Sequence, residues 1–168
     1  MAGLHIQEFT SIVGNPAKIF QWEILIPALP ISSIKAQSAQ FPGVGSTDID
    51  LYHMGQIAKF PGTVEYEHTW QCVIVESESG DVFNAMYEWK QLIHDQKTGF
   101  QDSPASFKKD VIIMGISSAS IPWIKIILKQ AYPKSIDTLE LDKASNTEAW
   151  KWTLLFNYDW WQKADSLI

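Results

Sequence analysis

The sequence contains no arginine, and all 13 of its basic residues are lysines. Arginine is the side chain best suited to bidentate contacts with phosphates and base edges, and domains that read DNA sequence are typically basic. Here the formal net charge is −6. The composition argues against a tight grip on nucleic acid, so we expect DNA that meets this protein to pass without tight binding.

Cysteine is almost absent, since Cys72 is the only one in the chain. One cysteine forms neither an internal disulfide nor a zinc-ligand cluster, which fits a reducing compartment or one where redox state does not matter. Residues 1–8 show no basic segment followed by an apolar run, and no uncharged stretch approaches the length of a membrane span. We therefore expect a protein that is soluble where it is made and does not insert into a membrane.

Signatures of catalysis and cofactor binding are also missing. No Gly-x-Ser-x-Gly motif occurs, and the glycines of residues 43–45 lack the spacing of a phosphate-binding loop. Asp48, Asp50 and His53 match neither an EF-hand nor a zinc pattern, so a solvent-facing row of a strand is favoured over a metal site. We expect no catalytic residue, no cofactor and no metal.

The main pattern in the sequence is an alternation of apolar and polar residues with a period of two. This pattern predicts strands with an apolar and a polar face. Residues 63–75 predict one long strand whose apolar face holds Val64, Tyr66, His68, Trp70, Cys72 and Ile74. Its polar face holds Thr63, Glu65, Glu67, Thr69 and Gln71. Residues 150–161 predict a second long strand, and shorter strands are expected at residues 20–26, 31–39, 47–53, 111–116, 121–132 and 138–141.

One segment departs from the strand pattern. Residues 80–95 carry apolar side chains at helical spacing, and Ser79 is expected to cap the start of this helix. A chain of 168 residues is most economically one domain. The sequence therefore predicts a single, mainly β domain over residues 1–168, with one amphipathic helix beside a mostly antiparallel sheet.

Two loops interrupt the pattern. Phe-Pro turns bracket residues 41–62, which predicts a long hairpin or loop that leaves the body of the domain. Residues 98–109 read as a second loop. The chain also has eight tryptophans, which fit a self-assembling protein and a large ordinary core equally well.

The sequence also leaves open an alternative from a different class of protein. Glu65, Glu67 and His68 lie close together in the sequence, so a small β-barrel could use a cleft beside them to bind a ligand or act as an enzyme. Such a protein would be a monomer with a deep pocket. Glu65 and Glu67 more simply form part of a wet strand face, and His68 a satisfied, partly buried side chain.

The order and spacing of several segments resemble the tail tube proteins of contractile-tailed bacteriophages. These segments are residues 20–24, the strand pattern of residues 60–75, the helix with residues 84–89, and the stretch from 138 to 160. The resemblance extends from about residue 16 to residue 161. It implies a non-enzymatic fold of two sheets packed near a right angle into a small barrel, with one helix at the side.

The resemblance also implies an assembly. Six copies would close into a ring, and rings would stack into the inner tube of a contractile sheath, the conduit for DNA ejection. The implied partners are other copies of the chain, the sheath, and the baseplate and terminator proteins, in a virion assembled in the host cytoplasm. A type VI secretion tube, a pyocin-like tube and a specialised initiator or terminator ring share this architecture and stay open as alternatives.

Carried over from that family, residues 41–62 correspond to an extended hairpin that builds the tube wall and touches the adjacent ring. The contact candidates are Phe41, Ile49, Leu51, Tyr52 and Phe60. A ring of six would carry 6 × −6 = −36 formal charges. A negative lumen repels DNA phosphates, and the lumen candidates are Asp48, Asp50, Glu65 and Glu67.

Overall fold

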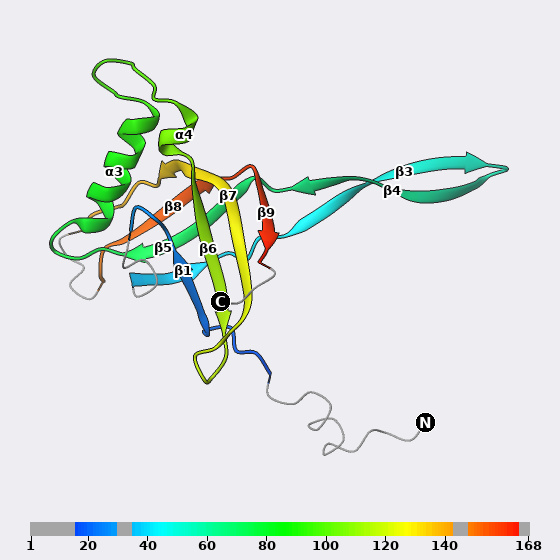
Figure 1. Ribbon diagram of the computed structural model, residues 1–168, viewed down its shortest axis with the longest axis horizontal. Coiled ribbons are helices and arrows are strands. Elements are labelled where there is room, and N and C mark those ends of the chain that lie inside the picture. The colour runs from blue at the N-terminus through cyan, green and yellow to red at the C-terminus, as the bar shows by residue number, and fades with distance from the viewer. Residues whose placement is uncertain (1–15, 30–34, 143–147, 165–168) are drawn as a thin grey trace.

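The computed structural model describes residues 16–29, 35–142 and 148–164. Figure 1 shows a β-rich body with a helix at one side and a long two-stranded ribbon that projects from it. In chain order the elements are β1 (Trp22–Leu25), β2 (Ala36–Ala39), β3 (Val44–His53), β4 (Gln56–Tyr66), β5 (Thr69–Val75), α3 (Asp81–Ile93), α4 (Pro104–Phe107), β6 (Lys109–Ile116), β7 (Pro122–Ile136), β8 (Lys151–Asn157) and β9 (Trp160–Lys163).

The body is built from antiparallel strands in the order β1-β6-β7-β8-β5-β2, with β9 beside β7. The first half of β7 pairs with β6 and β9, and its second half pairs with β8. Strand β7 therefore belongs to two sheets that cross in Figure 1. The expected mainly β fold with two sheets and one flanking helix is confirmed.

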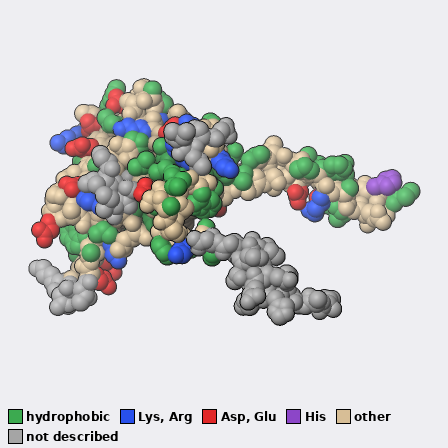
Figure 2. Space-filling view, turned by 60° about the horizontal axis from the view of Figure 1, so that its bottom comes forward, with side chains coloured by type: hydrophobic (Ala, Val, Ile, Leu, Met, Phe, Trp, Pro, Cys, Tyr) green, Lys and Arg blue, Asp and Glu red, His purple; other side chains and the backbone are tan. Residues whose placement is uncertain are grey.

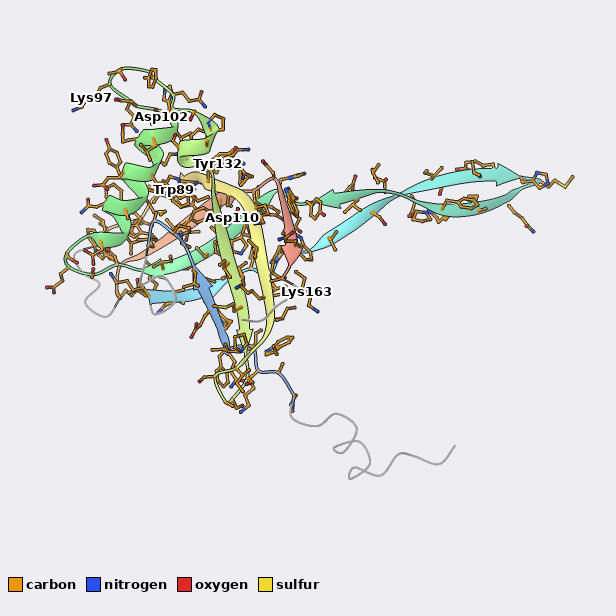
Figure 3. All side chains as sticks on the ribbon, viewed as in Figure 1. Trp89, Lys97, Asp102, Asp110, Tyr132 and Lys163 are labelled. Carbon is orange, nitrogen blue, oxygen red and sulfur yellow. The ribbon has the colours of Figure 1, made fainter. Side chains whose placement is uncertain are left out.

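A bend in β7 allows this sharing. Gln130 has a left-handed backbone, with φ 58°, and the β6–β7 register shifts between Lys109 and Val111. Asp110, labelled beside these strands in Figure 3, accepts hydrogen bonds from the backbone N–H of Gln130 and from the Lys129 ammonium. A bulge of this kind turns a strand sharply. Within the part of the chain that the structure describes, the strands do not close into the expected small barrel, because β1 and β2 end the order without pairing with each other.

The core lies between the two sheets and α3. Alternation along β5 buries Trp70, Cys72 and Ile74, as the sequence predicts. Burial raises the pKa of the Cys72 thiol, so this side chain is inert core. Of the tryptophans, Trp70 and Trp89 are buried in the core, whereas Trp123, Trp150 and Trp160 are exposed on the single chain.

The helix forms where its apolar spacing predicts, but its cap differs from the prediction. Gly80 is the N-cap residue, with φ 72°, and Ser79 does not cap the helix. Instead, Glu76 accepts hydrogen bonds from the backbone N–H groups of Val82 at 3.1 Å and Phe83 at 2.8 Å. A carboxylate at this end also meets the positive end of the helix dipole.

Four other expectations need correction. The single strand predicted at residues 63–75 is wrong, because His68 adopts a left-handed backbone, with φ 56°, and separates β4 from β5. The strand predicted at residues 150–161 likewise breaks into β8 and β9. Residues 138–141 form no strand, and the loop predicted at residues 98–109 contains the short helix α4 and the first residue of β6.

Candidate assembly surface

The ribbon that leaves the body is the hairpin of β3 and β4, which confirms the excursion predicted for residues 41–62. Met54 and Gly55 connect the strands, and both have positive φ, 46° and 78°. This conformation suits a two-residue turn whose twist matches that of the strands. In the described part of the chain, no third strand pairs with this hairpin.

A bulge interrupts the hairpin near its middle. The register moves from Ser46 opposite Val64 to Asp48 opposite Pro61, so Gly62 and Thr63 together face Thr47. The Thr47 hydroxyl accepts a hydrogen bond from the backbone N–H of Thr63 at 2.9 Å. A Cβ on Gly62 would lie 2.4 Å from the Thr47 Oγ1, so this close approach requires glycine.

One face of the outer hairpin is apolar. Residues directly opposite in a strand pair point to the same face, and the register pairs Ile49 with Phe60 and Leu51 with Ala58. We call these four residues the apolar stripe. Ile49, Leu51 and Phe60 are each about half exposed, at 52%, 56% and 50%. Figure 2 shows hydrophobic side chains along the projecting hairpin.

The structure thus brings three of the five predicted contact residues together, namely Ile49, Leu51 and Phe60. Tyr52 pairs with Ile57 and points to the opposite face, because it follows Leu51 directly. Phe41 precedes β3 and lies outside the hairpin strands. Ala58, which completes the apolar stripe opposite Leu51, was not among the predicted contact residues.

The predicted acidic residues also separate. Asp48 and Asp50 lie on the face opposite the apolar stripe, where Lys59 forms salt bridges with both, at 3.3 and 3.2 Å. Glu65 lies beyond the bulge, opposite Gly45. Glu67 follows β4 in the break before β5, so Glu65 and Glu67 do not share one continuous strand face.

The cleft expected beside Glu65, Glu67 and His68 is small. A pocket of about 290 Å³ lies there, and its lining includes Glu67 but neither Glu65 nor His68. His68 is exposed rather than partly buried, and its ring lies between those of Tyr66 and Tyr158. Among the residues 16–29, 35–142 and 148–164, no three His, Cys, Asp or Glu side chains gather to hold a metal ion.

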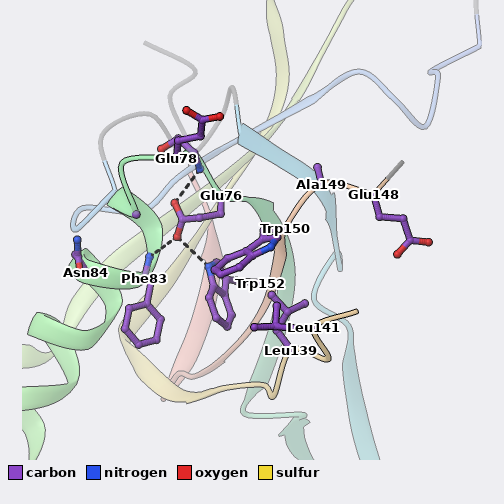
Figure 4. A pocket seen from close by; sticks show the side chains of 12 residues that line it. Glu76, Glu78, Phe83, Asn84, Leu139, Leu141, Glu148, Ala149, Trp150 and Trp152 are labelled. Atoms are coloured by element: carbon purple, nitrogen blue, oxygen red, sulfur yellow. Dashed lines mark hydrogen bonds between the residues drawn. The ribbon is translucent and has the colours of Figure 1, made fainter. Parts of the chain in front are cut away.

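A larger groove of about 830 Å³ lies at the start of α3 (Figure 4). Phe83, Trp150 and Trp152 form its aromatic part, and Leu139 and Leu141 extend it. Glu76 accepts a hydrogen bond from the Trp152 indole at 2.9 Å, and this carboxylate links the groove to the helix. This surface could not be predicted from local sequence patterns, because its residues come from three separate segments.

No helix within the described ranges is both long and apolar enough to span a membrane. With the fold and its projecting surface established, the chain can be compared with known proteins. The model of the phage tail tube protein family matches residues 32–164, which is most of the chain. The chain belongs to this family of structural proteins, and its role is that of a tail-tube component.

Solved structures show the same fold in related machines. The tube-terminating cap of the anti-feeding prophage aligns with a TM-score of 0.68 and 18% identity, over 92% of this chain and 94% of that chain. A chain of the sheath-tube complex from an extracellular contractile injection system, PVC, aligns with a TM-score of 0.62 and 16% identity, over 92% and 97%. A comparison with curated protein sequences gave no match.

Proposed function

We propose that this chain is the protomer of a tail tube: six copies form a ring, and the rings stack inside a contractile sheath as the conduit for DNA ejection. The family assignment and the fold support a tube component. The observation that carries the assembly step is the apolar stripe on a hairpin that lies outside the body (Figure 2).

The energetics of the hairpin favour a partner. An isolated two-stranded hairpin is marginally stable in water. Apart from Thr47, Gly62 and Tyr66, every residue of both strands is exposed in the single chain. Contact of the stripe with the adjacent ring would remove Ile49, Leu51 and Phe60 from water. At roughly 25 cal/mol per Å² of apolar surface, such burial favours stacking.

Charge supports the passage of DNA through such a ring. With six copies the ring carries 6 × −6 = −36 formal charges. Asp48, Asp50, Glu65 and Glu67 are all exposed and are our lumen candidates, with Asp48 and Asp50 partly offset by Lys59. Phosphates are repelled from a negative wall, so the genome would slide without sticking.

The second candidate function is a specialised ring in a related assembly. The similarity to a tube-terminating cap favours a terminator ring among these. A terminator would form a ring that stops growth, whereas a tube protomer would stack repeatedly. The sheath, baseplate and terminator proteins would be partners in either case. Both functions would place the chain in a virion or a phage-like particle.

Electron microscopy of the purified protein over a range of concentration and salt tests this proposal. We expect stacked tubes for a tube protomer, and single rings at all concentrations for a terminator. The double variant Ile49→Ser/Leu51→Ser should keep its thermal melting temperature but lose stacking. Phe100→Ser, which removes an exposed apolar side chain from a loop outside the hairpin, is the control. Equal stacking of the double variant and the control would refute the role of the stripe.

A further inference from the structure

The direction in which the hairpin leaves the body needs a physical cause. The hairpin forms its own two-stranded sheet within the described part of the chain, so no ladder of backbone hydrogen bonds ties it to the body strands. It is also long, and a small rotation at its root displaces the apolar stripe greatly (Figure 1). The contacts that hold the root of the hairpin therefore determine the position of the apolar stripe.

One side chain contacts both sides of the hairpin at this root. Trp161 in β9 donates its indole N–H to the carbonyl oxygen of Gly43, which directly precedes β3, at 3.0 Å. The same indole lies edge-on to the ring of Tyr66, the last residue of β4, with centroids 6.3 Å apart and an angle of 78°. Val44 and Tyr66 form the last register pair of the hairpin, so Trp161 contacts the residue that leads into β3 and the last residue of β4, where the hairpin meets the body.

The position of Trp161 is itself fixed by the body. Its strand β9 pairs with β7, where Trp161 stands opposite the fully buried Leu128. A second contact continues from Tyr66 into the sheet. The His68 ring lies edge-on to that of Tyr66, its Nδ1 is hydrogen-bonded to the Tyr158 carbonyl oxygen, and the Tyr158 backbone N–H donates to the His68 carbonyl oxygen. Tyr158 is part of the core. The root is therefore tied to the core through Trp161 and through His68.

We infer that Trp161 is a positioning residue that sets the orientation of the hairpin, and with it the place at which the apolar stripe meets a second copy of the chain. Edge-on aromatic contact and an indole hydrogen bond both depend on direction, so together they favour one orientation. The neighbouring Trp160 points to the other face of β9 and is 42% exposed, so it should not have this effect.

The orientation of the hairpin relative to the body can be tested on the single chain, by measuring the distance between two spin labels. One label is placed by Met54→Cys at the tip, and the other by Glu88→Cys on the exposed face of α3. Cys72 is 1% exposed and stays unlabelled. Labelled chains are diluted with unlabelled protein, so that only distances within one chain are measured.

Trp161→Phe keeps the ring against Tyr66 but removes the donor to Gly43, and Trp161→Ala removes both contacts. Trp161→Phe loses one net hydrogen bond, so the fraction of chains whose label-to-label distance differs from the main wild-type distance should increase about fivefold. Trp161→Ala should broaden the distribution further, and Trp160→Ala should match the wild type. Melting curves identify variants that fail to fold; if Trp161→Ala is one, Trp161→Phe decides.

An unchanged distance distribution in folded Trp161→Phe and Trp161→Ala would overturn the inference. Its consequence for assembly rests on the proposed function, so tube formation is measured on the same variants. If the wild type forms no rings or tubes and the distances still respond to Trp161, the proposed function fails and the positioning role stands. If the wild type assembles and the distances do not respond, the positioning role fails alone.

Discussion

Glu76 accepts the indole N–H of Trp152 at 2.9 Å, and these two residues join the end of β5 to β8 at the first turn of α3 (Figure 4). The same carboxylate accepts backbone N–H groups from Ser77, Val82 and Phe83. Burial alone would raise the pKa of Glu76, but these donors outweigh it, and its pKa lies below the usual value. One side chain thus caps the helix and attaches it to the sheet.

We predict that Glu76→Gln lowers the free energy of unfolding at neutral pH by about 1 kcal/mol, the usual cost of a lost helix cap. Because folding lowers this pKa, the stabilisation is complete above the unfolded value of about 4.3 and is lost as the pH falls through the folded value. Urea unfolding over a range of about four pH units, from roughly pH 3 to neutral, measures this difference. Glu78→Gln, an exposed carboxylate two residues on, is the control, and an equal loss in both variants would contradict the cap.

Gly62→Ala should distort the hairpin, whereas Gly45→Ala should not. A Cβ at Gly62 would lie 2.9 Å from the Thr47 carbonyl oxygen as well as 2.4 Å from its hydroxyl, but nothing lies within 4 Å of one at Gly45. Overpacking of this kind costs about 1 to 3 kcal/mol, which corresponds to roughly five- to hundredfold faster amide exchange in the hairpin. Hydrogen exchange along β3 and β4 measures it. Equal exchange in the two variants would show that the bulge tolerates a side chain.

Cys72 should report on unfolding of the core. Burial and the raised pKa of its thiol keep it from reacting in the folded protein. We expect a thiol reagent to modify Cys72 at least about a thousandfold more slowly than a cysteine placed at Met54, because reaction requires the core to open. The two rates should converge in denaturant. Rapid modification under native conditions would show that β5 opens locally.

Removal of negative charge should make assembled tubes retain DNA. The variant Asp48→Asn/Asp50→Asn/Glu65→Gln/Glu67→Gln changes the charge of each chain from −6 to −6 + 4 = −2. In a ring of six, the total becomes 6 × −2 = −12. We expect more duplex DNA to co-sediment with these tubes at low salt, with a steep decrease as salt increases.

The control for this experiment has the same net charge. Glu78, Glu88, Asp137 and Glu140 are exposed acids outside the hairpin, and their neutralisation also gives −2. If the first four acids line the lumen, only their loss should increase retention inside the tube. Equal retention by both variants would show that total charge matters and that the lumen candidates are not special.

Features that depend on local spacing could be predicted from the order of the amino acids. Period-two alternation along β5 placed Trp70, Cys72 and Ile74 in the core, and helical spacing placed Val82, Met86 and Trp89 on the buried side of α3. Phe-Pro turns marked the hairpin. Each of these patterns needs only neighbouring residues, because the geometry of a strand or a helix fixes which side chains share a face.

The points at which those patterns stop depend on contacts between distant parts of the folded chain. The left-handed backbone of His68 divides one alternating run into two strands, and the bulge opposite Thr47 separates Glu65 from the row of Asp48 and Asp50. Glu76 replaces Ser79 as the helix cap, and Trp161 reaches Gly43 across 118 residues of sequence. These contacts depend on where the folded sheets bring distant segments together, and no local period encodes that position.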